Sequence, residues 1–203
     1  ARSAFPKMSF MLDAENNYNL ESSLEVAKEL EKLEYTWFEA PLPDYDFEGY
    51  KKITDSVGIK IIPSGNWIVD LQRFSEAIKN KIWSATRTDM AMIGGLTNGK
   101  KAMDLSAAGG LNCEIMSWGY TLVSVANLHL MLSSNNCSYY EQPLPYETFE
   151  FGMDDVLRTN KDGHMHAPTK PGLGMEVNWD QMKTKVIHSF VCDKNEKIGY
   201  VHA

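Results

Sequence analysis

Apolar and polar positions follow two alternating rhythms along the first two thirds of the chain. Apolar side chains recur at helical spacing between Leu24 and Leu33, with Glu and Lys on the opposite face, which predicts an amphipathic helix. Similar patterns predict further helices at 47–57, 70–80, 96–109 and 121–133. The short β-rich or apolar runs between them predict strands at 9–13, 36–39, 59–63, 84–89, 112–116 and 137–141.

The order of these elements indicates an α/β fold with a parallel sheet, because helices of about 10–15 residues separate the strands. The strands recur about every 25 residues, the rhythm of a TIM-type (β/α) barrel, and the segments share no motif that would indicate a solenoid. Six such steps end at Glu141. A complete barrel has eight steps and about 250 residues, so we expect residues 1–142 to form a partial barrel.

The alternation stops after Glu141, where the sequence Gln-Pro-Leu-Pro begins a different region. Turn-forming residues occur at 160–163 and again at 168–174. We therefore expect residues 143–203 to form an irregular tail that contains a hairpin and a short helix.

Composition excludes several classes of protein. The 203 residues are 43% hydrophobic, enough for one sizeable core, and this excludes wholesale disorder. The net charge of −7 argues against nucleic acid as a partner, and no apolar run has the roughly 20 residues that a membrane helix needs. The three cysteines are widely spaced and include no C-x-x-C pair, which favours reduced thiols and a cytoplasmic location.

Oxygen-bearing side chains stand at or just past the ends of five predicted strands: Asp13, Glu39, Asn66, Asp89 and Glu141. The carboxyl ends of barrel strands converge on one face, where active sites lie. Each residue could simply cap the helix that follows it. Several carboxylates at one mouth repel each other, however, and a bound cation relieves that repulsion. Oxygen ligands of this kind suit Mg²⁺.

Several of these positions lie in motifs that resemble the enolase superfamily, and its mandelate racemase-like branch in particular. The motifs are MLDAEN at 11–16, WFEAPLP at 37–43, PSGN at 63–66, DMAMIGGLT at 89–97, DGH at 162–164 and PGLGMEV at 171–177. The resemblance implies a modified (β/α)7β barrel, of which this chain supplies the C-terminal part, about strands 3 to 8. It also implies that the tail at 143–203 returns towards an N-terminal capping domain.

The resemblance also implies a Mg²⁺ ion held by Asp13, Glu39 and Asn66. Such an ion binds a substrate carboxylate and stabilises the enediolate that forms when a base removes the α-proton. Glu141 matches a glutamate of the family that lies over the substrate carboxylate, and its expected role is a protonated hydrogen-bond donor to the enediolate.

Two departures from the family pattern affect these expectations. The third ligand position is usually acidic, whereas Asn66 is neutral. Asp89 matches an aspartate that orients a catalytic histidine, but segment 112–120 contains no histidine, which leaves Asp89 as a catalytic candidate or as a structural residue. The expected general base would lie upstream of Ala1. Tyr120 and Glu15 are further catalytic candidates, against a packing role for Tyr120 and an exposed loop position for Glu15.

The resemblance thus favours a Mg²⁺-dependent lyase that dehydrates an acid sugar of the galactarate type to a 2-keto-3-deoxy acid. Loss of the histidine–aspartate pair suits dehydration on one face of the substrate better than two-base racemisation. The alternatives are a racemase, epimerase or cycloisomerase of the same superfamily, and a barrel relative without catalytic activity. The expected partner is a small-molecule carboxylate, with no nucleic acid and no membrane, and the expected assembly is a homo-oligomer.

Overall fold

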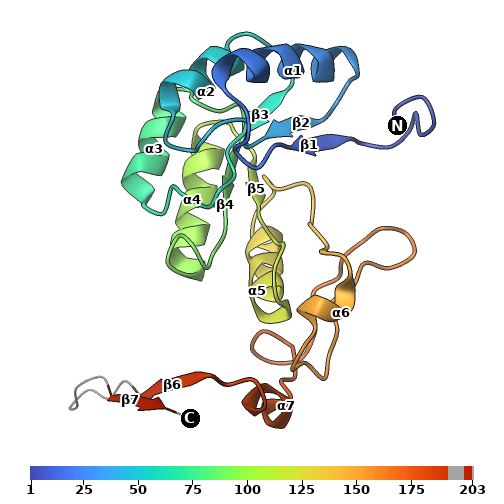
Figure 1. Cartoon of the computed structure of the whole chain (residues 1–203), viewed down its shortest axis with the longest axis vertical. Coiled ribbons are helices and arrows are strands. Elements are labelled where there is room, and N and C mark those ends of the chain that lie inside the picture. Colours follow the sequence, from blue (N-terminus) through green and yellow to red (C-terminus); the bar gives the residue numbers. More distant parts are fainter. Residues whose placement is uncertain (192–198, 203) are drawn as a thin grey trace.

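Five strand–helix steps form in the predicted order in the computed structural model, which describes residues 1–191 and 199–202 (Figure 1). The elements are β1 (Met11–Asp13), α1 (Leu20–Lys32), β2 (Trp37–Glu39), α2 (Phe47–Thr54), β3 (Lys60–Ile62), α3 (Leu71–Lys79), β4 (Thr86–Thr88), α4 (Leu96–Ala108), β5 (Cys113–Ile115) and α5 (Thr121–Leu132). The α/β prediction is confirmed, with strands shorter than the sequence patterns suggested.

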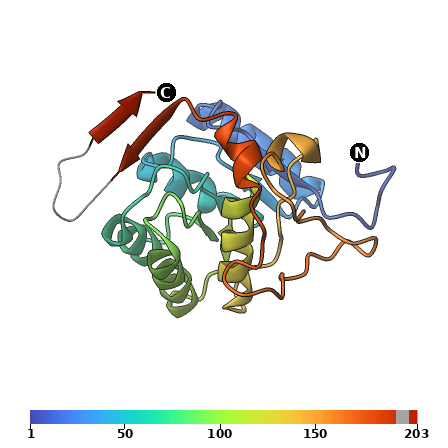
Figure 2. The same ribbon diagram turned by 90° about the horizontal axis from the view of Figure 1, so that it is seen from below.

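The strands pair in parallel in two groups, β1–β2–β3 and β4–β5. The register places Asp13 beside Glu39, because both residues end their strands. The amide of Ser84 donates to the carbonyl of Ile61 over 3.1 Å and links the two groups just before β4 begins. Helices α1 to α5 follow one another around the outside of the strands (Figures 1 and 2). The carboxyl ends of the strands therefore point towards one region, as in part of a barrel.

The predicted sixth strand at 137–141 is wrong, because this segment is extended without joining a strand ladder. Its main-chain groups are bonded largely by polar side chains that follow or belong to β5. The amide of Ser138 donates to the buried carboxylate of Glu114 over 2.9 Å, and the amide of Glu141 donates to Oγ of Ser117 over 2.7 Å. Side-chain oxygens thus accept the hydrogen bonds of these amides. In a strand, the main-chain carbonyls of a neighbouring strand would accept them.

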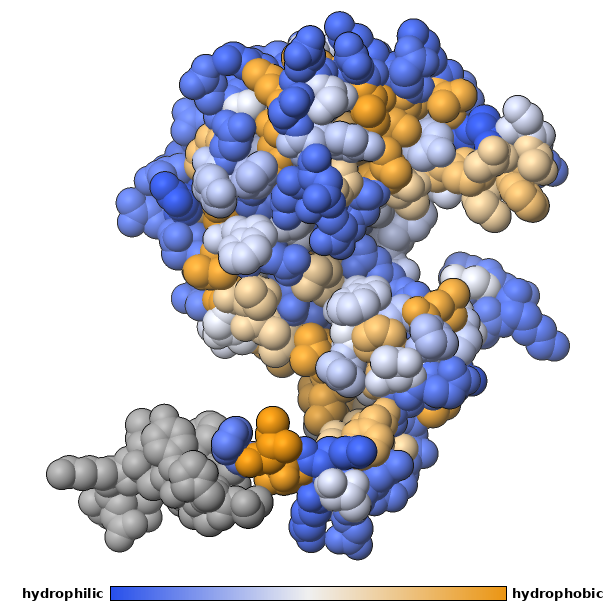
Figure 3. All heavy atoms as spheres, in the orientation of Figure 1, coloured by the Kyte–Doolittle hydropathy of each residue, from blue (hydrophilic) through white to orange (hydrophobic). Residues whose placement is uncertain are grey.

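The core lies between the helices and the strands, and Trp83 is at its centre. The Trp83 ring meets Phe47 and Tyr50 edge-on at centroid distances of 5.8 and 6.3 Å, and it also contacts Phe74. Asn19, Asp46 and Asp70 cap α1, α2 and α3 with side-chain oxygens, which satisfies amides that helix starts leave free. The outer surface over α1 and α2 is largely hydrophilic (Figure 3).

The tail contains α6 (Tyr146–Phe149), α7 (Trp179–Lys183) and the antiparallel pair β6 (His188–Val191) and β7 (Gly199–His202). A turn forms at 160–163 as predicted, with the amide of Gly163 donating to the carbonyl of Asn160, but no strands flank it. Cys192 lies outside the described residues. Among the residues that are described, no helix is both long enough and apolar enough to cross a bilayer.

Candidate active site

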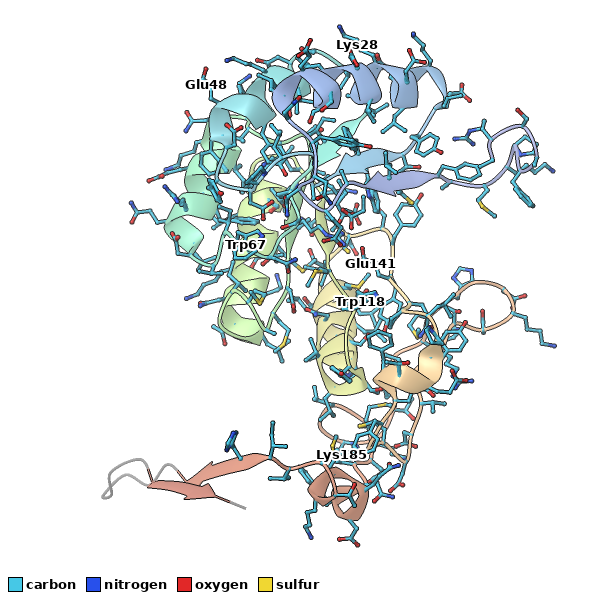
Figure 4. The ribbon with its side chains drawn as sticks, in the orientation of Figure 1. Lys28, Glu48, Trp67, Trp118, Glu141 and Lys185 are labelled. Carbon is cyan, nitrogen blue, oxygen red and sulfur yellow. The ribbon has the colours of Figure 1, made fainter. Side chains whose placement is uncertain are left out.

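A cavity of about 580 Å³ opens at the carboxyl ends of the strands. Its lining combines residues within or just after each of the strands β1 to β5 with Glu141 from the segment after α5: Asp13, Glu15, Glu39, Ser64, Asn66, Arg87, Met116, Trp118 and Glu141. In Figure 4, Glu141 and Trp118 lie next to each other between the β1–β3 sheet and α5. The three expected metal ligands, Glu15 and Glu141 are therefore brought together, while their chemical roles stay predictions.

Arg87, in the middle of β4, lies among these carboxylates and was not a candidate from the sequence. Its side chain is only 3% exposed, and its Nε lies 2.9 Å from Oε1 of Glu39. Its Nη2 forms a second ion pair with Glu141. A charged residue within the short run Thr-Arg-Thr of a buried strand was the available signal, because such a residue needs a partner inside the fold.

Glu39 ends β2 and is buried with both carboxylate oxygens engaged. Oε1 lies beside Arg87, and Oε2 accepts a hydrogen bond from Nε1 of Trp37 over 3.2 Å. Burial raises the pKa of Glu39 to about 8; Arg87 acts in the opposite direction, and the nearby carboxylates of Glu141 and Asp13 raise the value. Burial opposes the positive charge of Arg87, but Glu141 and Glu39 outweigh that effect, and the pKa of Arg87 is raised.

Asp13 and Glu15 line the cavity next to Glu39. Oδ1 of Asp13 accepts a hydrogen bond from the amide of Glu15 over 2.9 Å, a tight turn in which Glu15 has a φ of 50°. The negative charge of Asp13 raises the pKa of the Glu15 carboxyl, with a smaller contribution from burial. Glu15 thus lines the cavity, although its role as a catalytic residue stays a prediction.

Asn66 is placed by a buried aspartate, Asp44, which the sequence analysis did not single out. Asp44 accepts hydrogen bonds from the amide and the hydroxyl of Ser64 over 2.7 and 2.8 Å and from the amide of Trp67 over 3.3 Å. The intervening Gly65 has a φ of +80°, and a Cβ added there would lie 3.0 Å from Cγ of Arg87. The loop after β3 is therefore held against β4.

Two predicted catalytic residues are not brought to the cavity. Asp89 is buried, and its Oδ1 accepts hydrogen bonds from Nδ2 of Asn127 over 2.7 Å and from the amide of Ala91 over 2.9 Å. Asn127 in turn donates to the carbonyl of Met116 over 3.0 Å, so Asp89 ties the end of β4 to α5 and β5. Tyr120 is 63% exposed and packs on Phe149 at a centroid distance of 5.8 Å. Both placements favour the structural alternatives.

The donors around Glu39 do not fit the magnesium site that the resemblance implies. Both oxygens of Glu39 already have partners, the third ligand position holds a neutral amide, and a buried guanidinium lies within the cluster. Among residues 1–191 and 199–202, no group of three or more His, Cys, Asp or Glu side chains is arranged to hold a metal ion. We therefore derive no catalytic step through a metal.

Comparison with known proteins gives a consistent family. Residues 1–181 match the family described as Enolase C-terminal domain-like. The D-galactonate dehydratase family member RspA of Pantoea ananatis is 27% identical over 175 residues, which are 82% of this chain and 40% of that protein. The L-talarate/galactarate dehydratase of Salmonella typhimurium is 25% identical over 180 residues, 85% of this chain and 42% of that protein. The chain thus spans less than half the length of these curated relatives.

Solved structures agree with the sequence matches. A structure from Pseudovibrio sp., assigned provisionally to the mandelate racemase/muconate lactonizing enzymes, has a TM-score of 0.88 and 37% identity over 90% of this chain and 50% of its own. The D-glucarate dehydratase of Agrobacterium tumefaciens, complexed with magnesium, has a TM-score of 0.77 and 27% identity over 90% of this chain and 48% of its own. The fold of this chain therefore also occurs in these two solved structures, of which it covers about half.

Proposed function

Because the chain belongs to the Enolase C-terminal domain-like family, we propose that the protein abstracts the proton α to a substrate carboxylate and stabilises the resulting enediolate. The match over residues 1–181 confirms the resemblance to the mandelate racemase-like branch of the enolase superfamily. We further propose that the α/β fold of this chain is part of a modified (β/α)7β barrel, to which the chain supplies about strands 3 to 8.

The observation that carries the proposal is the convergence of charged groups on one cavity at the strand ends. Asp13, Glu39 and Glu141 come from three different segments and surround Arg87. The cavity of about 580 Å³ has the size of a small-molecule site. An α-proton is too weakly acidic to be removed by an ordinary side chain unless fixed charges or hydrogen-bond donors stabilise the developing negative charge.

Arg87 is the cationic side chain among the described residues that line the cavity, and it can therefore meet a negative charge there. A guanidinium binds carboxylates through paired N–H groups, and it remains charged at any working pH. Within the described part of the chain, Nη1 of Arg87 has no hydrogen-bond partner, so it is free to donate to an anionic ligand. Glu141 can donate to an enediolate only in its protonated form, and its Oε2, the oxygen outside the ion pair with Arg87, is the position for that proton.

We propose an acid sugar as substrate and dehydration as the reaction, giving a 2-keto-3-deoxy acid. The relatives named above support this choice: a member of the D-galactonate dehydratase family, an L-talarate/galactarate dehydratase and a D-glucarate dehydratase. After a base takes the α-proton, the C–O bond to the β-hydroxyl breaks and a general acid, such as the protonated base, donates the proton with which that group leaves as water; the resulting enol then becomes the ketone. We assign the general base to a residue outside this chain and retain Glu15 as the candidate within it.

The experiment uses the intact protein that contains this chain, incubated with galactarate, glucarate, talarate and galactonate in deuterated water. We expect formation of a 2-keto-3-deoxy acid, detected with semicarbazide, and its loss in Asp13→Asn. Asp162→Asn is the matched control, because Asp162 lies in the exposed 160–163 turn. A protein that neither releases water from these acids nor exchanges their α-protons would refute the proposal.

Isomerisation is the alternative, and a cycloisomerase among the relatives favours it. The 3,6-anhydro-alpha-L-galactonate cycloisomerase of Streptomyces coelicolor is 24% identical over 175 residues. Deuterium at the α-carbon of an unchanged acid, without loss of water, would identify racemisation or epimerisation in place of dehydration.

The remaining expectations stay proposals about the whole protein. These are the division into a partial barrel at 1–142 and a tail at 143–203, a homo-oligomeric assembly and a cytoplasmic location. Size-exclusion chromatography with light scattering on the intact protein measures the assembly directly.

A further inference from the structure

A buried positive charge occupies the middle of the carboxylate cluster where the resemblance implies a magnesium ion. Arg87 is 3% exposed, its Nε lies 2.9 Å from Oε1 of Glu39, and its Nη2 is paired with Glu141. The remaining oxygen of Glu39 is bonded to Trp37. The carboxylate that a metal ion would need therefore already has a cation and a donor as partners.

The formal charges of the cluster lead to the same conclusion. Three carboxylates around a divalent cation have a net charge of −1. Asn66 removes one negative charge from that set, and Arg87 adds one positive charge. Asp13, Glu39, Asn66 and Arg87 together also have a net charge of −1, without any metal. The neutral Asn66 and the positive Arg87 together thus compensate for the two charges that a magnesium ion would supply.

We propose that Arg87 replaces the divalent cation in this site, so that the protein stabilises its anionic ligand without magnesium. This inference deepens the proposed function, because it names the charge that faces the substrate carboxylate and the enediolate. It concerns the same cavity, but it can be tested through metal binding alone.

The bonding of Arg87 favours a ligand-binding role over a purely structural ion pair. Its Nε is buried and, despite its closeness to Glu39, has no hydrogen bond of good geometry. Nη1 also has no hydrogen-bond partner within the described residues. A structural arginine at this depth would be expected to use all of its N–H groups. Nε is enclosed beside Glu39, so Nη1 is the donor that this cavity-lining side chain offers to an anion.

The packing around Arg87 keeps the guanidinium in one position. Gly65 lies against the Arg87 main chain and Cγ, with a Cβ position 3.0 Å from Cγ and 3.2 Å from the carbonyl carbon. Asp44 holds the same loop through Ser64. A charge that is fixed before the reaction begins stabilises a developing negative charge without reorganisation, which is what a bound metal ion otherwise supplies.

The test measures Mn²⁺ binding, by electron paramagnetic resonance, to the intact protein after treatment with EDTA. We expect no saturable binding by the wild type at millimolar Mn²⁺ and saturable binding by Asn66→Glu/Arg87→Gln. Asn66→Glu/Arg87→Lys keeps the positive charge and should not bind. Asn66→Glu/Arg158→Gln removes a guanidinium from the tail, where the Arg158 side chain is 40% exposed, and should also not bind.

Circular dichroism establishes which variants are folded. Saturable Mn²⁺ binding by the wild type that is lost in Asp13→Asn would overturn the inference, and so would a folded Asn66→Glu/Arg87→Gln variant that gains none. If Asn66→Glu/Arg87→Gln does not fold, the wild type and Asn66→Glu/Arg87→Lys still test the inference. Saturable Mn²⁺ binding by either of these proteins at the Asp13 site would contradict it. A wild type that binds no Mn²⁺ and is inert towards acid sugars both with and without Mg²⁺ would refute the proposed function and leave this inference standing, whereas activity that appears only when Mg²⁺ is added would overturn the inference.

Discussion

Nε of Arg87 lies 2.9 Å from Oε1 of Glu39, and both side chains are almost completely withdrawn from solvent. β4 supplies the guanidinium and β2 the carboxylate, so the contact crosses the space enclosed by the strands. Glu141 pairs with the same guanidinium from the extended segment that follows α5. One arginine therefore links three segments of the chain at the mouth of the proposed active site.

Removing Arg87 should destabilise the fold, because it leaves buried carboxylates without their cation. We expect Arg87→Met to lower the free energy of unfolding by about 3 kcal/mol, measured by urea denaturation. Combining it with Glu39→Gln should cost less than the sum of the single changes, with a coupling of about 1 kcal/mol or more. Arg158→Met removes an ion pair whose arginine is 40% exposed and should cost less, about 1 kcal/mol. Strictly additive effects would contradict the contact.

Gly65 should tolerate no side chain, since its backbone conformation and its surroundings both oppose one. A Cβ at Gly65 would combine a φ of +80° with a position 3.0 Å from Cγ of Arg87. Gly163 has a φ of +78° with no atom within 4 Å of its Cβ position, and it is the matched control. We expect Gly163→Ala to cost about 1 kcal/mol and Gly65→Ala at least about 1 kcal/mol more, by thermal denaturation. Equal costs would show that the loop does not press on Arg87.

Asp44 should be needed as an acceptor rather than for its size. Asp44→Asn keeps the shape but places an NH₂ group towards donors from Ser64 or Trp67, so we expect a loss of about 2 kcal/mol in stability. Asp46→Asn is the control two residues away, because Asp46 caps α2 and asparagine caps helices equally well. Urea denaturation of both variants measures the difference, and a neutral Asp44→Asn would rule out the proposed support of the Asn66 loop.

The two described cysteines should react slowly with alkylating reagents at neutral pH. Burial raises the pKa of Cys113 to about 11 and that of Cys137 to about 12. The thiolate is the reactive form, so alkylation by iodoacetamide should be slow at pH 8 and should rise about tenfold per pH unit while the protein stays folded. Peptide mass spectrometry of native and urea-unfolded protein measures both rates. Equal rates in the two states would mean that these thiols are not buried.

Much of the fold could be predicted because it follows from local periodicity. The spacing of apolar residues between Leu24 and Leu33 needs only the geometry of one helix, and that helix forms as α1. The same holds for the alternation up to α5. Strand lengths could not be predicted as well, because pairing between strands decides where each one ends.

The residues of the candidate site were partly predictable for the same reason. Asp13 and Glu39 end strands that were visible in the sequence, and the parallel register then placed them side by side. Asp89 has an equivalent position in the sequence, but its carboxylate is bonded to Asn127 on a helix 38 residues later. Only the packing of α5 against the end of β4 decided that Asp89 would not line the cavity.

The sequence by itself determined the order of strands and helices and the set of polar residues at the strand ends, since both depend on near neighbours in the chain. The tertiary structure alone decided that segment 137–141 is not a strand and that Arg87 meets Glu39 and Glu141. Those outcomes depend on hydrogen bonds and ion pairs between residues far apart in the chain. Such contacts form only after the folded backbone has brought their partners together and removed them from water.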